Sequence, residues 1–246
     1  MNMVIFGGTT AGRELSAALA SRGVAVTVCV ATPYGAEEQG GISGVTVLTG
    51  RRSEAEKLEL LRAAALCVDA THPYATGITE SVKAACAAAN VPYRRLLRSA
   101  GDTADAVVVA DAAEAAKYLQ GTQGNILLTT GAKELPTFAA LPRERLYARV
   151  LPSREGIVAC EAAGIPHRNI IAMQGPFSEE LNAALLRQYD ISYLVTKDGG
   201  AAGGYPEKQR AARACGARLV LLRRPDETGE TMETILQEIE ELRRCK

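Results

Sequence analysis

The chain has 246 residues, and its 28 lysines and arginines balance 28 aspartates and glutamates, so the formal net charge is zero. This balance argues against a general affinity for nucleic acids or membrane surfaces, and an anionic ligand would have to be met by local basic residues. No apolar run approaches the ~20 residues that cross a bilayer, and no signal peptide precedes the first apolar segment, so we expect a cytoplasmic protein.

The first motif is a glycine-rich turn between an expected strand and an expected helix. The apolar run 3–6 is followed by GGTTAGR and then by leucines at helical spacing. Glycines let the backbone approach a phosphate, and the first amides of the helix point at it. The frame is G-x-G-x-x-G with threonine in place of the middle glycine. It predicts a nucleotide or dinucleotide site, with a purely structural turn as the alternative, at Gly7, Gly8, Thr9, Thr10, Gly12 and Arg13.

The next two strand ends bear on the choice of cofactor. The buried strand expected over 24–30 runs into ATPYG, without the carboxylate that would favour NAD. We therefore favour NADP, with Thr32 at the cofactor, although 32–35 could be a simple turn. Arg51 and Arg52 follow the strand expected over 45–48. They are candidates for a 2′-phosphate or for substrate carboxylates, and a solvated charge pair is the alternative.

A polar loop follows the strand expected over 66–70. Ligands of open α/β sheets bind at the carboxyl ends of strands, so we expect this loop to contact the cofactor through Thr71, His72, Pro73 and Tyr74. His72 is interpreted as a neutral histidine that shapes the loop rather than as a general acid or base. Tyr74 could stack on a ring or donate a hydrogen bond. Asp69 stands in an apolar strand and needs a partner if it is buried.

Alternating strands and helices continue after a polar, glycine-containing stretch at 99–106, which is the expected linker. The pattern predicts an α/β fold with two parallel-sheet domains, residues 1–99 and 100–246. The last helix is expected over Thr228–Leu242, within the second domain. The second half also has the polar loops TTGAK, QGPFS and TKDGGAAGG after its strands. Lys133 and Lys197 stand at equivalent strand ends, where they indicate an anion site or are simply solvated.

Five motifs in this order resemble the precorrin-6A reductase family, including its cobalt-precorrin-6A branch: GGTTAGREL, DATHPYA, LLTTGAKEL, AMQGPFSEELN and VTKDGGAAGGYPEK. The resemblance covers nearly the whole chain. It implies NADPH-dependent reduction of a carbon–carbon double bond of the macrocycle during cobalamin synthesis. It also implies two Rossmann-like domains with the active site in the cleft between them, and a strand exchanged between the domains.

On this resemblance, residues 1–99 bind NADPH and the second domain binds the tetrapyrrole. The substrate residues are expected to be Lys133, Gln174, Gly175, Ser178, Lys197, Gly199 and Gly200. A ring with many carboxylates requires basic side chains and helix N-termini. Reduction of the double bond also requires a proton. Lys197 is the candidate carboxylate ligand or acid, and Tyr74, His72 and water are the other candidate donors.

Two other functions remain open at this point. One is an NADP-dependent reductase of a different anionic substrate, and the other is a non-catalytic NADP-binding sensor, against which the polar loops of the second half count. The ring may be metal-free or may contain cobalt, and we expect no metal ligand in the protein. The six cysteines are scattered without a C-x-x-C motif, which predicts small buried side chains.

Overall fold

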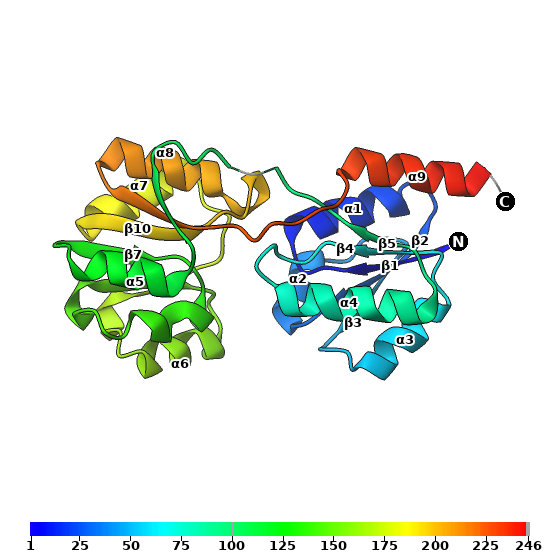
Figure 1. Ribbon diagram of the computed structural model, residues 1–246, viewed down its shortest axis with the longest axis horizontal. Helices are drawn as coiled ribbons and strands as arrows, with labels where there is room; N and C mark the ends of the chain where they lie inside the picture. The colour runs from blue at the N-terminus through cyan, green and yellow to red at the C-terminus, as the bar shows by residue number, and fades with distance from the viewer. Residues whose placement is uncertain (100, 245–246) are drawn as a thin grey trace. The chain divides into compact units, whose positions relative to one another are not determined.

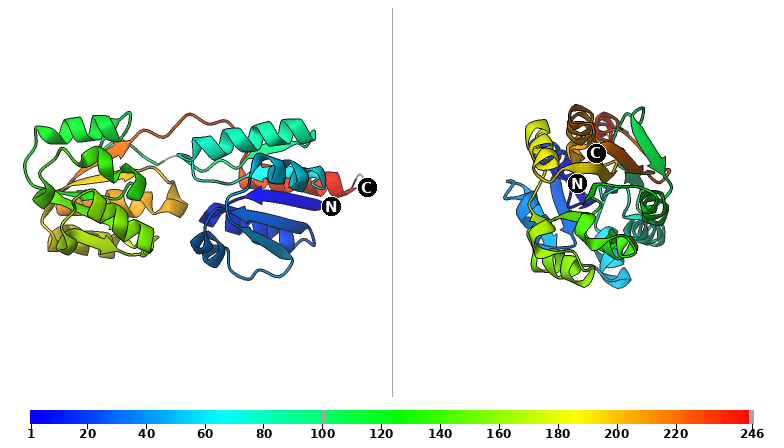
Figure 2. Two further views of the ribbon diagram at one scale, coloured as in Figure 1. Left: turned by 90° about the horizontal axis from the view of Figure 1, so that it is seen from below. Right: turned by 90° about the vertical axis from the view of Figure 1, so that its left-hand side faces the viewer.

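The structure is a computed structural model that describes residues 1–99 and 101–244, and the chain forms two compact α/β units (Figure 1). Unit 1 consists of Met1–Arg98 together with the segment that starts at Pro225, and unit 2 is Ser99–Arg224. The chain therefore passes twice between the units, as Figures 1 and 2 show.

Unit 1 is built on a parallel sheet with the strand order β3-β2-β1-β4-β5. Its strands are β1 (Asn2–Phe6), β2 (Ala25–Val30), β3 (Val45–Thr49), β4 (Leu66–Asp69) and β5 (Tyr93–Arg95). The order reverses between β1 and β4. In open α/β sheets, ligands bind at the carboxyl ends of the strands at such a reversal, so the topology directs a ligand to the loops after β1 and β4.

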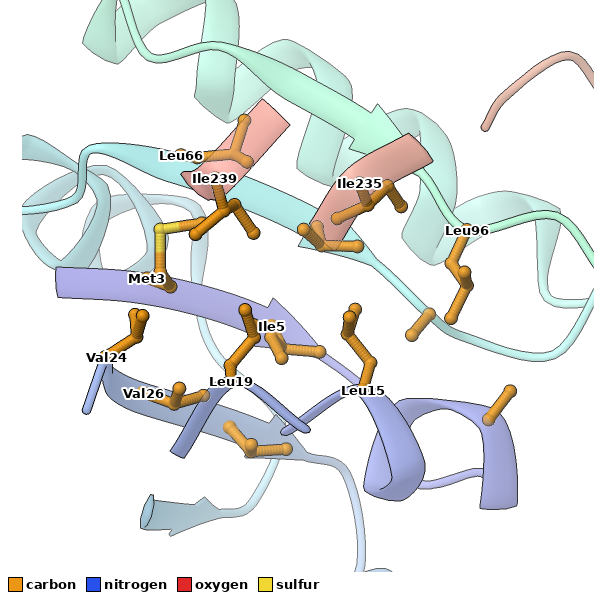
Figure 3. Close-up of a cluster of buried hydrophobic side chains, with 14 of the residues drawn as sticks. Met3, Ile5, Leu15, Leu19, Val24, Val26, Leu66, Leu96, Ile235 and Ile239 are labelled. Carbon is orange, nitrogen blue, oxygen red and sulfur yellow. The ribbon is translucent and has the colours of Figure 1, made fainter. Parts of the chain in front are cut away.

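Helices cover both faces of this sheet (Figure 1). They are α1 (Thr10–Ala20), α2 (Pro33–Gln39), α3 (Glu54–Arg62), α4 (Thr76–Ala89) and α9 (Met232–Arg244). Leu15 and Leu19 of α1 and Ile235 and Ile239 of α9 are fully buried against one face (Figure 3). On the other face, Leu61 of α3 and residues of α4 pack against β1 and β4. Burial of apolar surface on both faces explains the near-continuous apolar strands.

The structure differs from the expected boundary of the second domain, 100–246, at its C-terminal end. Helix α9 starts at Met232 and completes the core of unit 1 through Ile235 and Ile239. The segment before it joins the edge of the first sheet, where Leu96 and Glu230 form a parallel bridge. The backbone amide of Leu97 donates to the carbonyl of Glu230 at 2.9 Å. The last helix thus belongs with the first unit because its apolar face is buried there.

Unit 2 contains a second parallel sheet with the order β6-β11-β10-β7-β8-β9. Its strands are β6 (Ala106–Val109), β7 (Asn125–Leu128), β8 (Leu146–Val150), β9 (Ile170–Ala172), β10 (Ile191–Lys197) and β11 (Arg218–Leu222). Here the order reverses between β7 and β10. The loops that begin at Thr129 and Asp198 therefore start next to one another, at the ends of paired strands.

The helices of unit 2 also lie on both faces of their sheet (Figure 1). The α-helices are α5 (Ala112–Gln120), α6 (Arg154–Ala162), α7 (Glu179–Gln188) and α8 (Tyr205–Cys215), and the 3₁₀ turns are η1 (Ala132–Phe138), η2 (Arg143–Arg145), η3 (His167–Asn169) and η4 (Ala201–Gly203). Helices α7 and α8 share one buried cluster with β10 and β11. The predicted α/β fold with two Rossmann-like parallel sheets is confirmed.

Most of the cysteines lie where a small apolar side chain fits. Cys29, Cys67, Cys86 and Cys160 are buried, and Cys215 is partly buried. Burial raises the pKa of Cys29 to about 11, so its thiol stays protonated at neutral pH. Cys245 lies outside the described residues. Among the described helices, none is long and apolar enough to cross a membrane.

Candidate functional site

The glycine-rich loop after β1 leaves little room for side chains at two of its glycines. A Cβ at Gly12 would lie 3.2 Å from the Cβ of Ala70, and a Cβ at Gly7 would lie 3.3 Å from Val28. Gly8 has a φ of +94°, a region that side chains disfavour. Helix α1 therefore starts close to the end of β4. The loop is shaped as a cradle between the two strands where the sheet order reverses.

The threonine that replaces the middle glycine has a structural role within this cradle. Its hydroxyl accepts a hydrogen bond from the amide of Gly12 at 3.2 Å, which caps α1, and donates to the carbonyl of Ala70 at 2.8 Å. Thr9 thus ties the loop to β4. The next residue, Thr10, opens α1, and the first amides of a helix have no intrahelical acceptor. Glycine, a capped helix and exposed Arg13 fit a phosphate group.

The ends of β2 and β3 complete the same edge of the sheet. Thr32 caps α2 by accepting from the amide of Gly35 at 3.0 Å, so 32–35 begins a helix and is not a simple turn. A Cβ at Gly35 would lie 3.7 Å from the Cα of Gly8, which brings these two loops together. Arg51 is exposed after β3. The neighbouring Arg52 is engaged with Glu56 and with the carbonyl of Thr49.

The loop after β4 is shaped by its own side chains. Thr71 is buried and donates both its amide and its hydroxyl to Asp69, at 3.0 and 2.7 Å. The Nδ1 atom of His72 accepts from the amide of Tyr74 at 3.4 Å, and the two rings lie 5.5 Å apart at 41°. The ring of His72 therefore contacts the backbone and the tyrosine of its own loop.

In unit 2, an ion pair joins the loops at the reversal of the sheet. The Nζ of Lys197, at the end of β10, lies 2.8 Å from Oε1 of Glu134 in η1. The next residue, Asp198, is buried and accepts from the amides of Gly200 and Gly101, each at 2.9 Å. Gly199 is buried, and Gly200 has a φ of +69°. This loop is therefore held in one shape by a buried carboxylate.

The other predicted substrate residues lie in η1 and in the segment between β9 and α7. Lys133 is exposed in the first turn of η1. Gln174 is exposed after β9, and Gly175 is next to a ring, since a Cβ there would lie 3.0 Å from Phe177. Ser178 accepts from the amide of Leu181 at 3.3 Å and caps α7. Its hydroxyl therefore has a structural role at the start of that helix.

Two cationic side chains near the loop that follows β10, a buried arginine and a lysine, were not singled out from the sequence. The guanidinium of Arg149 in β8 lies 4.2 Å from the centroid of the Phe177 ring and donates to Oδ1 of Asn182 at 2.8 Å. Burial lowers the pKa of Arg149 to about 10. Lys208 in α8 donates to the carbonyl of Gly203 at 3.3 Å. Burial and the charge of Arg149 lower the pKa of Lys208 to about 8.

These two cations fit an anionic ligand. Among the described residues, Arg149 makes this one hydrogen bond and no ion pair with a carboxylate. A buried charge without a counterion is costly, and perturbed groups of this kind cluster at functional sites. The signal in the sequence is an arginine within the otherwise apolar strand LYARV. Within residues 1–99 and 101–244, no group of three histidine, cysteine or acidic side chains is placed to hold a metal ion.

Comparisons with known proteins agree over nearly the whole chain. A family model described as precorrin-6x reductase CbiJ/CobK matches residues 2–243. A cobalt-precorrin-6A reductase of Priestia megaterium is 32% identical over 245 residues, covering 96% of each chain. One of Salmonella typhimurium is 34% identical over 231 residues, covering 91% of this chain and 88% of that protein. The solved structure of a CobK precorrin-6A reductase has the same fold, with a TM-score of 0.78, 24% identity, and coverage of 98% of this chain and 97% of that chain.

Proposed function

Since the chain belongs to the precorrin-6x reductase family, we propose that this oxidoreductase of cobalamin biosynthesis transfers a hydride from NADPH to a carbon–carbon double bond of its ring substrate. The substrate is precorrin-6A or cobalt-precorrin-6A, reduced in the cytoplasm to the dihydro form. The relatives named above are cobalt-precorrin-6A reductases, which favours the cobalt-containing ring. The match of the family model from residue 2 to residue 243 carries this proposal.

The loops of unit 1 support a dinucleotide site. The cradle at Gly7 and Gly12 and the start of α1 would bind the pyrophosphate. The end of β2 offers the hydroxyl of Thr32 and no carboxylate, and exposed Arg51 follows the adjacent strand. A 2′-phosphate is favoured by such surroundings. The loop from Thr71 to Tyr74 would contact the nicotinamide, and a bound nicotinamide supplies the hydride.

The loops of unit 2 support a site for a ring with many carboxylates. Arg149, Lys208 and Lys197 provide cations around the carboxyl ends of its strands. Exposed Lys133 and Gln174 and the backbone of Gly175, Gly199 and Gly200 would add contacts. Charge-assisted hydrogen bonds to carboxylates are stronger than neutral ones. We assign binding and orientation of the macrocycle to these residues.

The reduction also consumes a proton, and two side chains are candidates for supplying it. The phenol of Tyr74 lies in the loop that we assign to the nicotinamide. Lys197 is the other candidate, although its ion pair with Glu134 favours a role as a ligand for a substrate carboxylate. Water is the third source. Orientation of the two rings and exclusion of water are the main tasks of the protein.

Anaerobic oxidation of NADPH, followed at the nicotinamide absorbance, tests the proposed function. We expect turnover with cobalt-precorrin-6A and a preference for NADPH over NADH, with precorrin-6A assayed separately. Turnover with precorrin-6A alone would reverse the choice of ring. Cofactor binding without turnover of either ring would contradict the proposed reaction and favour an NADP-binding sensor or a reductase of another anionic substrate.

A further inference from the structure

A buried carboxylate at the end of β4 organises the loop that we assign to the cofactor. Asp69 is fully buried. Its Oδ1 accepts from the amide and hydroxyl of Thr71 and lies 2.7 Å from Nη1 of Arg95. Its Oδ2 accepts from the hydroxyls of Thr79 at 2.7 Å and Tyr93 at 3.1 Å. Burial and the charge of Asp69 raise the pKa of Tyr93, so this phenol remains a donor.

The arginine that neutralises Asp69 also pairs with a second carboxylate. Arg95 is buried at the end of β5, and its Nη1 also donates to the hydroxyl of Thr71 at 3.0 Å. Its Nε donates to Oε2 of Glu227 at 2.9 Å. Loss of the Glu227 carboxylate would leave the Arg95–Asp69 pair neutral, but it would remove the charged acceptor of Nε, and hydrogen bonds to charged groups are the stronger ones. The orientation of the guanidinium toward Thr71 therefore depends on a carboxylate on each side.

Glu227 comes from the segment that returns to unit 1 after the second crossing. This segment is in close contact with Arg95. The amide of Glu230 donates to the carbonyl of Arg95 at 2.8 Å, and a Cβ at Gly229 would lie 2.3 Å from that same oxygen. Only glycine permits this approach. The backbone contacts thus set the register at which Glu227 meets the guanidinium.

Both loops assigned to the cofactor form hydrogen bonds at the end of β4. Thr71 begins the loop that contains His72 and Tyr74, and its polar groups are held by Asp69 and Arg95. The carbonyl of Ala70, between Asp69 and Thr71, accepts from the hydroxyl of Thr9 in the glycine-rich loop. A change in the orientation of Arg95 would therefore alter the positions of both the glycine-rich loop and the loop that starts at Thr71.

We propose that Glu227 is a positioning residue for the cofactor site, which acts through Arg95 and Asp69 on the loop from Thr71 to Tyr74. The identity of the cofactor rests on the proposed function. The returning C-terminal segment thus supplies more than the apolar face of α9. It supplies the carboxylate that completes the network beneath the cofactor loops.

The chain offers a matched control for Glu227. Glu238 in α9 also pairs with an arginine of β5, since Nε and Nη2 of Arg94 lie 2.8 and 2.6 Å from its carboxylate oxygens. This second pair joins the same two segments of unit 1. Within the part of the chain that the structure describes, Arg94 makes no hydrogen bond to Asp69 or Thr71. A purely structural role of Glu227 would therefore change stability and leave the affinity for NADPH as unaffected as we expect it to be in the Glu238 variant.

The experiment compares Glu227→Gln with Glu238→Gln in the full chain. The dissociation constant of NADPH is measured by nicotinamide fluorescence below the melting transitions, and kcat and KM are measured in the reductase assay. We expect Glu227→Gln to weaken NADPH binding by about tenfold, the effect of about 1.4 kcal/mol, with kcat at saturating NADPH little changed. Glu238→Gln should leave the dissociation constant within about twofold of the wild-type value.

A milder variant keeps the test decisive if Glu227→Gln fails to fold. Glu227→Asp retains the charge and shortens its reach, so it should give an intermediate loss of NADPH affinity. Equal dissociation constants for the wild type and the folded Glu227 variants would overturn the positioning role and leave the cofactor assignment standing. Absence of NADPH and NADH binding by the wild-type chain would instead overturn the cofactor assignment, and the positioning role with it.

Discussion

The ammonium group of Lys197 lies 2.8 Å from Oε1 of Glu134, and this ion pair joins the end of β10 to the turn that follows β7. The two strands are neighbours where the second sheet reverses its order. The carboxylate therefore holds the lysine at the edge of the sheet where a ligand is expected. Lys197 is oriented in advance, which favours a binding role for its charge.

Replacement of Lys197 by methionine should separate binding from proton transfer. We expect the KM for the ring substrate to rise about tenfold or more, because a charge-assisted hydrogen bond contributes roughly 1.5–3 kcal/mol, while kcat changes little. Steady-state kinetics with the ring varied at saturating NADPH provide the measurement. Lys117→Met, at an exposed position of α5, is the control. A fall in kcat at unchanged KM would make Lys197 the proton donor.

Arg51 should determine the preference for the phosphorylated cofactor. Arg51→Gln is expected to raise the KM for NADPH by about tenfold, since one charge-assisted hydrogen bond is lost, and to leave the KM for NADH unchanged. Arg52→Gln is the matched control, because that guanidinium is engaged with Glu56 and Thr49. Equal effects of the two substitutions on NADPH would place the 2′-phosphate elsewhere.

The glycine nearest to β4 should not accept a side chain without cost. Gly12→Ala places a methyl group 3.2 Å from the Cβ of Ala70, and such overpacking costs about 1–3 kcal/mol, which outweighs the roughly 0.5–1 kcal/mol that alanine gains over glycine in a helix. Gly77→Ala in α4 meets nothing within 4 Å and should stabilise the protein by about 0.5–1 kcal/mol. Denaturant unfolding of both variants provides the comparison. A Gly12→Ala protein as stable as the wild type would contradict the close approach of α1 to β4.

The lowered pKa of Lys208 predicts a dependence of stability on pH. This pKa is about 8 in the folded protein against 10.5 ordinarily. Between these values the unfolded chain binds more protons, so the stability contributed by this group rises with pH. Below about pH 8 both states are protonated, and the penalty of the buried charge is fully present.

Unfolding free energies of the wild type and of Lys208→Met, measured across pH 7–11, check this behaviour. We expect the unfolding free energy of the wild type to increase relative to that of the variant as pH rises from about 8 toward 10.5. Lys83→Met, at an exposed lysine of α4, should run parallel to the wild type. A constant difference between the wild type and Lys208→Met over this window would rule out a lowered lysine pKa.

Local patterns were sufficient to predict the sheets and the loops at their ends. The GGTTAGR turn indicates a strand, a turn and a helix, and the apolar run 24–30 indicates a strand buried on both faces. Asp69 stands in an apolar strand and would need a partner if buried; it is buried and accepts hydrogen bonds from Thr71. The Thr32-Pro33 pair is also a local signal for the start of a helix, through a cap and a first-turn proline, so the alternative of a simple turn at 32–35 is wrong.

Contacts between distant segments could not be read in the same way. The spacing of Ile235 and Ile239 predicts an apolar helix face, but either sheet could bury that face. Its placement on unit 1 depends on the second crossing of the chain. Likewise, an arginine within a strand does not reveal whether a carboxylate faces it. For Arg149 the partners are a ring and an amide from elsewhere in unit 2.

Hydride transfer to the ring is tested most directly with NADPH that carries deuterium at C4 of the nicotinamide. The two stereospecifically labelled forms are incubated separately with the protein and cobalt-precorrin-6A under anaerobic conditions, and the reduced ring is analysed by mass spectrometry. We predict that one of the two labels is transferred to the product. A reduced ring that contains deuterium from neither form would contradict hydride transfer from NADPH.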